Sequence, residues 1–268
     1  MAKPAPAPLP CPETVRPADI ADRLRRGDTD LVVVLGPTAS GKTRYAVQLA
    51  RSLGLPAEII SADSRQVYRG MDIGTGKDLG EYGAVPFHLI DICEAGEQYN
   101  LYRYKQDFKA AYADIRARGA VPILCGGTGL YIHAVTSGYD FSEGKPLSAP
   151  SAGTRLPEEG MPQKPYFIGT IVSREERNAR IDRRLDERLH EGMVEEVRGL
   201  LERGVPAETL LSYGLEYKFV TLYLRGELSY AEMRDRLATA IHQFAKRQMT
   251  WFRGMERSGV QIHWTHLP

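Results

Sequence analysis

This sequence contains few cysteines and no long apolar run. The 268 residues include three cysteines, Cys11, Cys93 and Cys125, which lie far apart and are odd in number. They match neither a disulfide framework nor the spacing of a metal site, which is typical of a protein from a reducing compartment. No apolar run approaches the roughly 20 residues that a membrane-spanning helix needs. We therefore expect a cytoplasmic protein that has no disulfides and makes no membrane contact.

The chain also lacks an excess of charge of either sign. The chain has 35 Lys and Arg against 34 Asp and Glu, for a formal net charge of +1. Without a global basic field, the protein could contact RNA only through a local patch. The composition, 43% hydrophobic and 26% charged, suits one α/β domain with a substantial core.

The most specific motif is Gly36-Pro-Thr-Ala-Ser-Gly-Lys-Thr43. It follows an apolar run at residues 31–35, typical of a buried parallel strand, and precedes residues 44–51, whose spacing predicts a helix. In that context the pattern indicates a phosphate-binding loop and not a chance turn. Backbone N–H groups and the helix N-terminus would converge on an anion, to which Lys42 adds a cation. The Thr43 hydroxyl could ligate Mg²⁺, so the loop predicts a site for a phosphate or diphosphate.

Polar side chains also follow three further apolar runs, at the ends of predicted strands. Asp63 comes after residues 57–61, Thr128 lies in a glycine turn after a strand ending at Cys125, and Arg174 follows residues 166–172. Ligands bind outside the carboxyl ends of strands in open α/β sheets, so these side chains should lie near the phosphate loop. A helix cap is the alternative role for Asp63 and Thr128, and Arg174 could clamp a phosphate.

Strands and helices alternate through the first two thirds of the chain. This alternation predicts an α/β protein with a P-loop NTPase-like parallel sheet, right-handed crossovers and flanking helices. After the fifth predicted strand the chain should be helical to about Phe252. We expect a flexible tail at residues 1–28, with a short helix from about Ala18, and one domain at residues 29–264. Hydrophobic periodicity is lost at residues 137–164, which predicts a mobile loop.

The end of the last predicted helix, residues 245–253, interleaves cations with aromatic side chains. Such a surface could stack on RNA bases and neutralise RNA phosphates. It could equally be a packed tryptophan with cations that extend to solvent. Both interpretations remain open at this point.

Six motifs follow one another along the chain. They are Gly36–Thr43, Ser61-Ala-Asp-Ser-Arg-Gln-Val-Tyr68, Gly70-Met-Asp-Ile-Gly-Thr75, His88-Leu-Ile-Asp91, Gly126-Gly-Thr-Gly-Leu-Tyr131 and Ala245-Lys-Arg-Gln-Met-Thr-Trp251. In this order they resemble the motifs of tRNA dimethylallyltransferases, also called isopentenyl-pyrophosphate transferases. The resemblance covers about Leu31 to Trp264 and implies a P-loop core like that of nucleotide kinases.

The resemblance implies that a dimethylallyl group passes from dimethylallyl diphosphate to the N6 amine of an adenine in the tRNA anticodon loop. Mg²⁺ would accompany the diphosphate, and the enzyme is expected to be a monomer. Asp63 would be the general base, and Ser64 and Gln66 would lie against the adenine. The diphosphate would be held by Gly36, Thr38, Ala39, Ser40, Gly41, Lys42, Thr43, Thr128 and Arg174. The RNA would be contacted by Lys246, Arg247, Gln248, Trp251 and Arg253.

The sequence departs from the family pattern in its RNA-grasping half. Family members usually carry a helical insertion where this chain has only the short segment 139–164. The usual Thr-Arg-Gln is here Ile241-His-Gln243, and the usual Gly-Tyr-Lys/Arg is here Gly214-Leu-Glu-Tyr-Lys218. Three alternatives therefore stay open, in this order: prenylation of a free adenine nucleotide, a P-loop small-molecule kinase, and a non-catalytic RNA-binding remnant.

Overall fold

The computed structural model describes residues 9–137 and 158–267. Within these residues six parallel strands form one sheet, in the order β3-β2-β4-β1-β5-β6. The strands are β1 (Leu31–Leu35), β2 (Ala57–Ser61), β3 (Phe87–His88), β4 (Val121–Gly126), β5 (Pro165–Thr170) and β6 (Ile262–Thr265). The predicted α/β class with a parallel sheet flanked by helices is confirmed.

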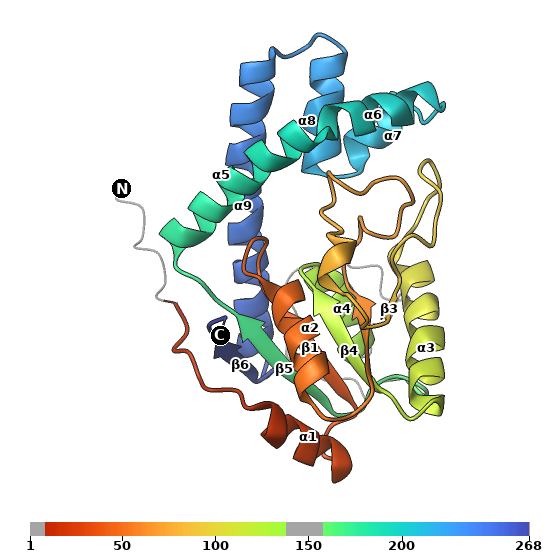
Figure 1. Cartoon of the computed structure of the whole chain (residues 1–268), viewed down its shortest axis with the longest axis vertical. Coiled ribbons are helices and arrows are strands. Elements are labelled where there is room, and N and C mark those ends of the chain that lie inside the picture. Colours follow the sequence, from red (N-terminus) through yellow and green to blue (C-terminus); the bar gives the residue numbers. More distant parts are fainter. Residues whose placement is uncertain (1–8, 138–157, 268) are drawn as a thin grey trace.

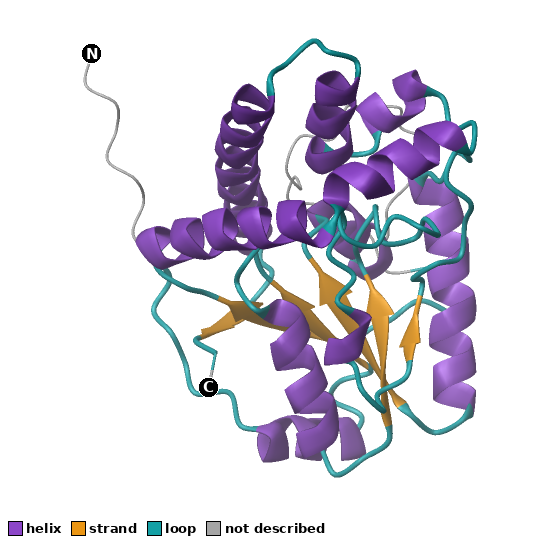
Figure 2. Cartoon of the chain, turned by 45° about the horizontal axis from the view of Figure 1, so that its top comes forward, coloured by secondary structure: helices purple, strands orange, loops and turns teal. Residues whose placement is uncertain are grey.

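Helices before β5 pack beside the sheet, and most of those after β5 lie beyond the carboxyl ends of the strands (Figure 1). The first group is α1 (Pro17–Arg25), α2 (Lys42–Ser52), the short 3₁₀ turn η1 (Leu79–Glu81), α3 (Leu101–Ala117) and α4 (Gly129–Thr136). The second group is α5 (Arg174–Glu191), α6 (Met193–Glu202), α7 (Ala207–Ser212), α8 (Leu215–Leu224) and α9 (Tyr230–Arg257). Figure 2 shows this second group gathered around one end of the twisted sheet. The predicted helical C-terminal region is thereby confirmed.

Alternation along the buried strands divides the core into two layers. Leu31, Val33 and Leu35 of β1 face the layer built with α3, α4 and α9. Val32 and Val34 face the opposite layer, built with α1 and α2. Because successive strand side chains point to opposite faces, a fully apolar strand needs cover on both sides. The sheet is therefore a rigid base, and its carboxyl edge is left for polar loops.

The edges of the sheet differ from the sequence prediction. The four-residue strand β6 was not predicted, because so short a run carries little periodic signal. The strand predicted at residues 87–91 stops at His88, since Leu89 and Asp91 adopt left-handed φ angles of 62° and 56°. Both differences concern outer strands, where pairing on one side only leaves the backbone less constrained.

The boundary predicted at residue 28 does not coincide with a structural boundary. Residues 1–8 lie outside the described residues, but α1 buries Ile20 and Ala21 in the core beside α2. The Glu13 N–H also donates to the Trp264 carbonyl at 2.6 Å. The segment 9–28 is therefore part of the folded domain and not a tail.

Most of the loop predicted at residues 137–164 also lies outside the described residues. Its last part is placed, with Met161 buried and Glu158 within 2.7 Å of the Lys105 ammonium group. Across the described ranges, no helix is long and apolar enough to cross a membrane.

Candidate active site

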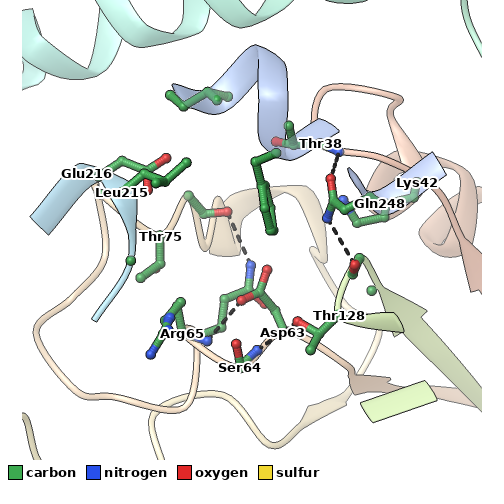
Figure 3. A pocket seen from close by; sticks show the side chains of 18 of the residues that line it. Thr38, Lys42, Asp63, Ser64, Arg65, Thr75, Thr128, Leu215, Glu216 and Gln248 are labelled. Atoms are coloured by element: carbon green, nitrogen blue, oxygen red, sulfur yellow. Dashed lines mark hydrogen bonds between the residues drawn. The ribbon is translucent and has the colours of Figure 1, made fainter. Parts of the chain in front are cut away.

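One cavity of about 480 Å³ opens where the carboxyl edge of the sheet meets the helical region (Figure 3). The phosphate loop and the loops after β2 and β4 form its sheet wall. Side chains of α5, α8 and α9 form its helical wall. Of the residues predicted from the sequence, the cavity is lined by Thr38, Lys42, Thr43, Asp63, Ser64, Gln66, Thr128, Arg247, Gln248 and Trp251.

The remaining residues of the phosphate loop shape it from behind. A Cβ on Gly36 would collide with the Thr170 and Ser40 hydroxyl groups, which hydrogen-bond to each other at 2.7 Å. Gly41 precedes α2 with a φ of 79°, and a Cβ there would collide with Leu267. Ala39 adopts a φ of 61°, which only a tightly held turn maintains in a residue other than glycine. The loop conformation thus depends on contacts with β5 and with the C-terminus of the chain.

Lys42 is the cation at the base of the cavity. Burial lowers the pKa of its ammonium group, and the nearby Arg184 and Arg188 act in the same direction, while Asp63 opposes the shift. Burial raises the pKa of the Cys125 thiol to about 12, so the thiol stays protonated and uncharged beneath Lys42. A buried ammonium group flanked by guanidinium groups is stabilised by a bound anion.

Asp63 lies at the carboxyl end of β2, where the sequence placed it. Its Oδ1 accepts a hydrogen bond from the Arg65 N–H at 2.9 Å, and its own N–H donates to the Ser61 hydroxyl at 3.3 Å. The carboxylate therefore closes a tight turn and also lines the cavity. Thr128 secures the same turn, because its hydroxyl accepts from the Ser64 N–H at 3.2 Å.

Gln66 and Gln248 use their amide groups to hold the cavity together. Gln66 is buried, accepts from the Ser61 hydroxyl at 2.9 Å and donates to the Gly76 carbonyl at 3.3 Å. Gln248 accepts from the Thr38 N–H at 2.8 Å and donates to the Gly127 carbonyl at 2.9 Å (Figure 3). Gln248, predicted to contact RNA, instead joins α9 to the phosphate loop and to the turn after β4.

The structure does not bring Arg174 to the cavity. Arg174 is exposed in the first turn of α5 and is not among the lining residues, so its position does not support a phosphate clamp. Two other arginines of α5 line the cavity instead. Arg184 forms an ion pair with Asp78, and Arg188 donates to the Gly74 carbonyl at 3.5 Å. Neither arginine was among the residues predicted from the sequence, because their spacing along the helix carried no sign of the cavity.

The aromatic and basic residues predicted at the end of α9 separate into two groups. Arg247 and Trp251 line the cavity, whereas Lys246 and Arg253 do not. The Trp251 ring packs so closely on Gly129 that a Cβ there would collide with it. Its indole N–H is buried and has no hydrogen-bond partner within the described residues. Trp251 is thus a packed wall of the cavity, while Arg247 stays exposed.

Glu216 is a lining residue that was not predicted from the sequence. It lies in the first turn of α8, within the segment that departs from the family pattern. Burial raises the pKa of its carboxyl group, and the neighbouring Arg188 opposes that shift. Among the residues that the structure describes, two carboxyl groups line the cavity, those of Asp63 and Glu216, on opposite walls.

Two family models match this chain. The family described as IPP transferase matches residues 66–159 and 141–255, and the family described as isopentenyl transferase matches residues 29–82. The two segments of the first match overlap at residues 141–159. Together the two families account for most of the chain from the first strand to α9.

Individual relatives agree with the family models. The chain is 50% identical to tRNA dimethylallyltransferase 1 of Porphyromonas gingivalis, over 87% of this chain and 93% of the relative. It is 48% identical to tRNA dimethylallyltransferase 2 of Syntrophotalea carbinolica, over 88% of this chain and 93% of the relative. The first alignment spans 286 positions, more than the 268 residues of this chain, so the relative has residues that this chain lacks.

Solved structures show the same fold. The tRNA isopentenylpyrophosphate transferase of Bacillus halodurans gives a TM-score of 0.75 at 30% identity, over 88% of this chain and 89% of that chain. A eukaryotic dimethylallyltransferase acting on tRNA gives a TM-score of 0.70 at 21% identity, over 87% of this chain and 73% of that chain, a likeness of fold alone. On the family models and the closely similar relatives, this chain belongs to the tRNA dimethylallyltransferase family.

Proposed function

We propose that this protein transfers a dimethylallyl group from dimethylallyl diphosphate to the N6 amine of an adenine in a tRNA anticodon loop. The relatives in Porphyromonas and Syntrophotalea are named for this activity, and the eukaryotic neighbour acts on tRNA. The observation that carries the proposal is that Lys42 and Asp63 line one cavity. The reaction needs a cation for the leaving diphosphate and a carboxylate for the amine proton.

The donor diphosphate is proposed to lie between Lys42 and Arg184. Backbone N–H groups of the phosphate loop and the N-terminus of α2 add partial positive charge there. Thr43 and Thr128 offer hydroxyl groups from the same wall. These groups would stabilise the negative charge that grows on the diphosphate as it leaves, which is the main electrostatic contribution available to this site.

Mg²⁺ is proposed to accompany the diphosphate. The described residues contain no group of three or more His, Cys, Asp or Glu that could hold a metal ion alone. This fits Mg²⁺, which proteins often bind through one or two oxygen ligands together with substrate phosphates. The Thr43 hydroxyl is the proposed protein ligand, with oxygen chemistry that suits the ion. When bound, Mg²⁺ would add positive charge beside the leaving group.

The groups in the cavity account for every bond and proton that changes in the transfer. The adenine N6 lone pair forms a bond to the allylic carbon, and the carbon–oxygen bond breaks with its electron pair passing to diphosphate. The proton from N6 passes to Asp63, whose Oδ1 is already oriented by the Arg65 N–H. An adenine amine is a poor nucleophile, so positioning and general-base catalysis must supply much of the rate.

Labelled dimethylallyl diphosphate offered to a tRNA anticodon stem-loop, to AMP and to ADP tests this function. Transfer of label to N6 of one adenine in the stem-loop, faster than to either nucleotide, is the expected result. Faster transfer to AMP would favour free nucleotides as acceptors. Transfer of phosphate from ATP in place of the prenyl group would indicate a kinase. A monomeric state and a cytoplasmic location remain predictions of the sequence.

A further inference from the structure

The carboxylate of Glu196, on α6, is enclosed by hydrogen-bond donors from another part of the chain. Its Oε2 accepts from the N–H groups of Asp72 and Ile73, both at 2.7 Å. Its Oε1 accepts from the Gly74 N–H at 3.0 Å and from the Tyr217 hydroxyl at 2.7 Å. Successive N–H groups that converge in this way form an anion-binding concavity. Here the anion is a side chain of the helical region.

The loop that surrounds Glu196 continues directly into the cavity wall. Gly74, Thr75 and Gly76 all line the cavity. Gly74 leaves no room for a side chain, because a Cβ would approach the Tyr217 ring to 2.8 Å. The loop, α6 and α8 are therefore in contact at the point where the loop reaches the cavity.

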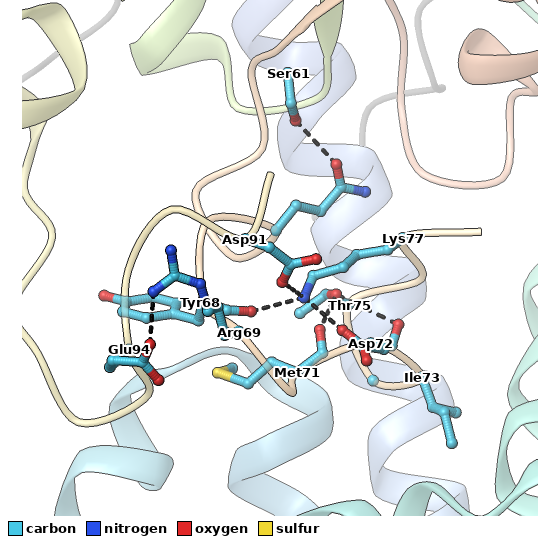
Figure 4. A network of polar contacts seen from close by, with 12 residues as sticks. Ser61, Tyr68, Arg69, Met71, Asp72, Ile73, Thr75, Lys77, Asp91 and Glu94 are labelled. Carbon is cyan, nitrogen blue, oxygen red and sulfur yellow. Dashed lines mark hydrogen bonds and ion pairs between the residues drawn. The ribbon is translucent and has the colours of Figure 1, made fainter. Parts of the chain in front are cut away.

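A chain of hydrogen bonds leads from this loop to Asp63. The Gly76 carbonyl accepts from Gln66, and Gln66 accepts from the Ser61 hydroxyl at 2.9 Å. The same hydroxyl accepts from the Asp63 N–H at 3.3 Å. In Figure 4 a dashed line from the labelled Ser61 marks its hydrogen bond to Gln66. Every step joins neighbouring groups, so a displacement of the loop at Gly76 reaches the turn that orients Asp63.

The base of the loop has a separate anchor. The buried Lys77 ammonium group donates to the Tyr68 carbonyl at 2.7 Å and to Asp72 at 2.5 Å, and it also pairs with Asp91 (Figure 4). Lys77 fixes the loop to the sheet side of the molecule, and its hydrogen bonds and ion pairs within the described residues go to Tyr68, Asp72 and Asp91 and not to α6. Loss of the Glu196 contacts should therefore release only the part of the loop that faces the cavity, and not unfold it.

We infer that Glu196 is a positioning residue for prenyl transfer, which holds the wall at residues 74–76 and through it the turn of Asp63. The inference rests on the proposed function for its kinetic readout. Two acceptor oxygens are needed here, because both carboxylate oxygens accept hydrogen bonds. A glutamine would offer one acceptor oxygen and would turn its NH₂ group toward N–H donors.

The test compares Glu196→Gln with Glu195→Gln. Glu195 is the preceding residue of α6, is exposed, and lies 3.8 Å from Arg198. For Glu196→Gln we expect kcat on the tRNA stem-loop to fall by roughly 10- to 100-fold, because small misplacements of reacting groups reduce reaction rates by amounts of this size. KM for dimethylallyl diphosphate should stay within about twofold, because the hydrogen bonds that Asp72, Ile73 and Gly74 donate go to Glu196 and not to the phosphate loop. Glu195→Gln should match the native protein in both constants.

Amide hydrogen exchange on the same variants separates this inference from the proposed function. Faster exchange at residues 72–74 and at Asp63 in Glu196→Gln alone supports the link, whichever acceptor the native protein uses. Unchanged kcat, or unchanged exchange at Asp63, would overturn the inference. So would an equal loss of kcat and donor affinity with a large fall in melting temperature, because that pattern indicates a purely structural role. Absence of prenyl transfer by the native protein would refute only the proposed function.

Discussion

The two walls of the cavity are built in different ways. On the sheet wall, the groups that face the ligand come from short contiguous motifs, and their positions follow from the strand ends and tight turns. On the helical wall, Arg184, Arg188, Glu216 and Arg247 come from three helices whose positions depend on tertiary packing. Strand ends and tight turns place the groups of the sheet wall, with β5 and Leu267 supporting the phosphate loop, whereas the packing of helices places the groups of the helical wall. The comparison indicates which residues a sequence motif can identify and which it cannot.

The sheet wall and the rim of the helical wall also differ in how far their polar groups are already hydrogen-bonded. Ser64 and Thr128 are hydrogen-bonded within the sheet wall, and Thr38 is tied to Gln248. At the rim of the helical wall, Phe244 and Arg247 are exposed. A preorganised wall suits the donor and the chemistry, because its groups need little rearrangement in the transition state. An exposed rim suits recognition of a large acceptor.

The largest effect is expected from Asp63→Asn on the sheet wall. The asparagine oxygen can still accept from the Arg65 N–H, so the turn is kept, but the base is lost. We expect kcat to fall by roughly 10² or more, with little change in melting temperature. Steady-state prenylation of the stem-loop and thermal denaturation measure the two quantities. Near-normal turnover would contradict the role of base, and an unfolded variant would show that the turn itself needs the carboxylate.

Lys42→Ala should weaken binding of dimethylallyl diphosphate by roughly 10- to 100-fold, the value of one or two charge-assisted hydrogen bonds. Calorimetry measures this affinity directly. Because burial lowers the pKa of Lys42, its charge is lost at a lower pH than that of an exposed lysine. Donor affinity of the native protein should therefore decline as the pH rises toward that lowered pKa. Arg174→Ala, outside the cavity, is the control, and an equal loss there would contradict the placement of the diphosphate.

The sequence predicted most of the fold and the sheet wall. The apolar runs and glycine turns identified β1, β2, β4 and β5, and the loops after them place Lys42, Asp63 and Thr128 together as expected. These predictions succeeded because strand order and loop position follow from general rules of parallel sheets. A motif of this kind is local, so it can be identified without information about the rest of the fold.

The helical wall was predicted poorly for a physical reason. Arg174 stands at a strand end and matched the rule for ligand positions. However, α5 begins at this residue, and its cavity-lining residues Arg184 and Arg188 lie about three and four turns further along the helix. Gln248 looked like a polar residue of an RNA surface, although it is buried between two loops. Helical periodicity shows which face is apolar, but the neighbour of each polar side chain depends on how the helices cross.

Gln248→Leu tests the bond between the two walls. The substitution would leave the Thr38 N–H and the Gly127 carbonyl without their partner, at a cost of about 2 kcal/mol in the free energy of unfolding. Donor affinity should also fall, because Thr38 belongs to the phosphate loop. Gln243→Leu, on an exposed turn of the same helix, is the matched control for urea denaturation. Equal stability of the two variants would show that the phosphate loop keeps its shape without α9.

The smallest effect is expected at the exposed rim, from Phe244→Ala. Phe244 is 39% exposed and lines the cavity, and the Arg247 guanidinium carbon lies 5.8 Å from the centre of its ring. A ring in this position can stack on a base that flanks the target adenine. Such stacking contributes about 1 kcal/mol of binding free energy at the low end of its range. We expect KM for the stem-loop to rise about fivefold, with kcat and donor KM unchanged.

Comparing KM for AMP with KM for the stem-loop shows how the Phe244 ring acts. AMP has no flanking base, so its KM should be insensitive to Phe244→Ala if the ring acts by stacking on RNA. Tyr230→Ala is the control, since Tyr230 is 49% exposed on the same helix and is not a lining residue. A rise in KM for AMP as large as that for the stem-loop would place the ring against the target adenine itself. An unchanged KM for the stem-loop would mean that the exposed rim does not recognise RNA, and the contrast between the two walls would then lie in their construction alone.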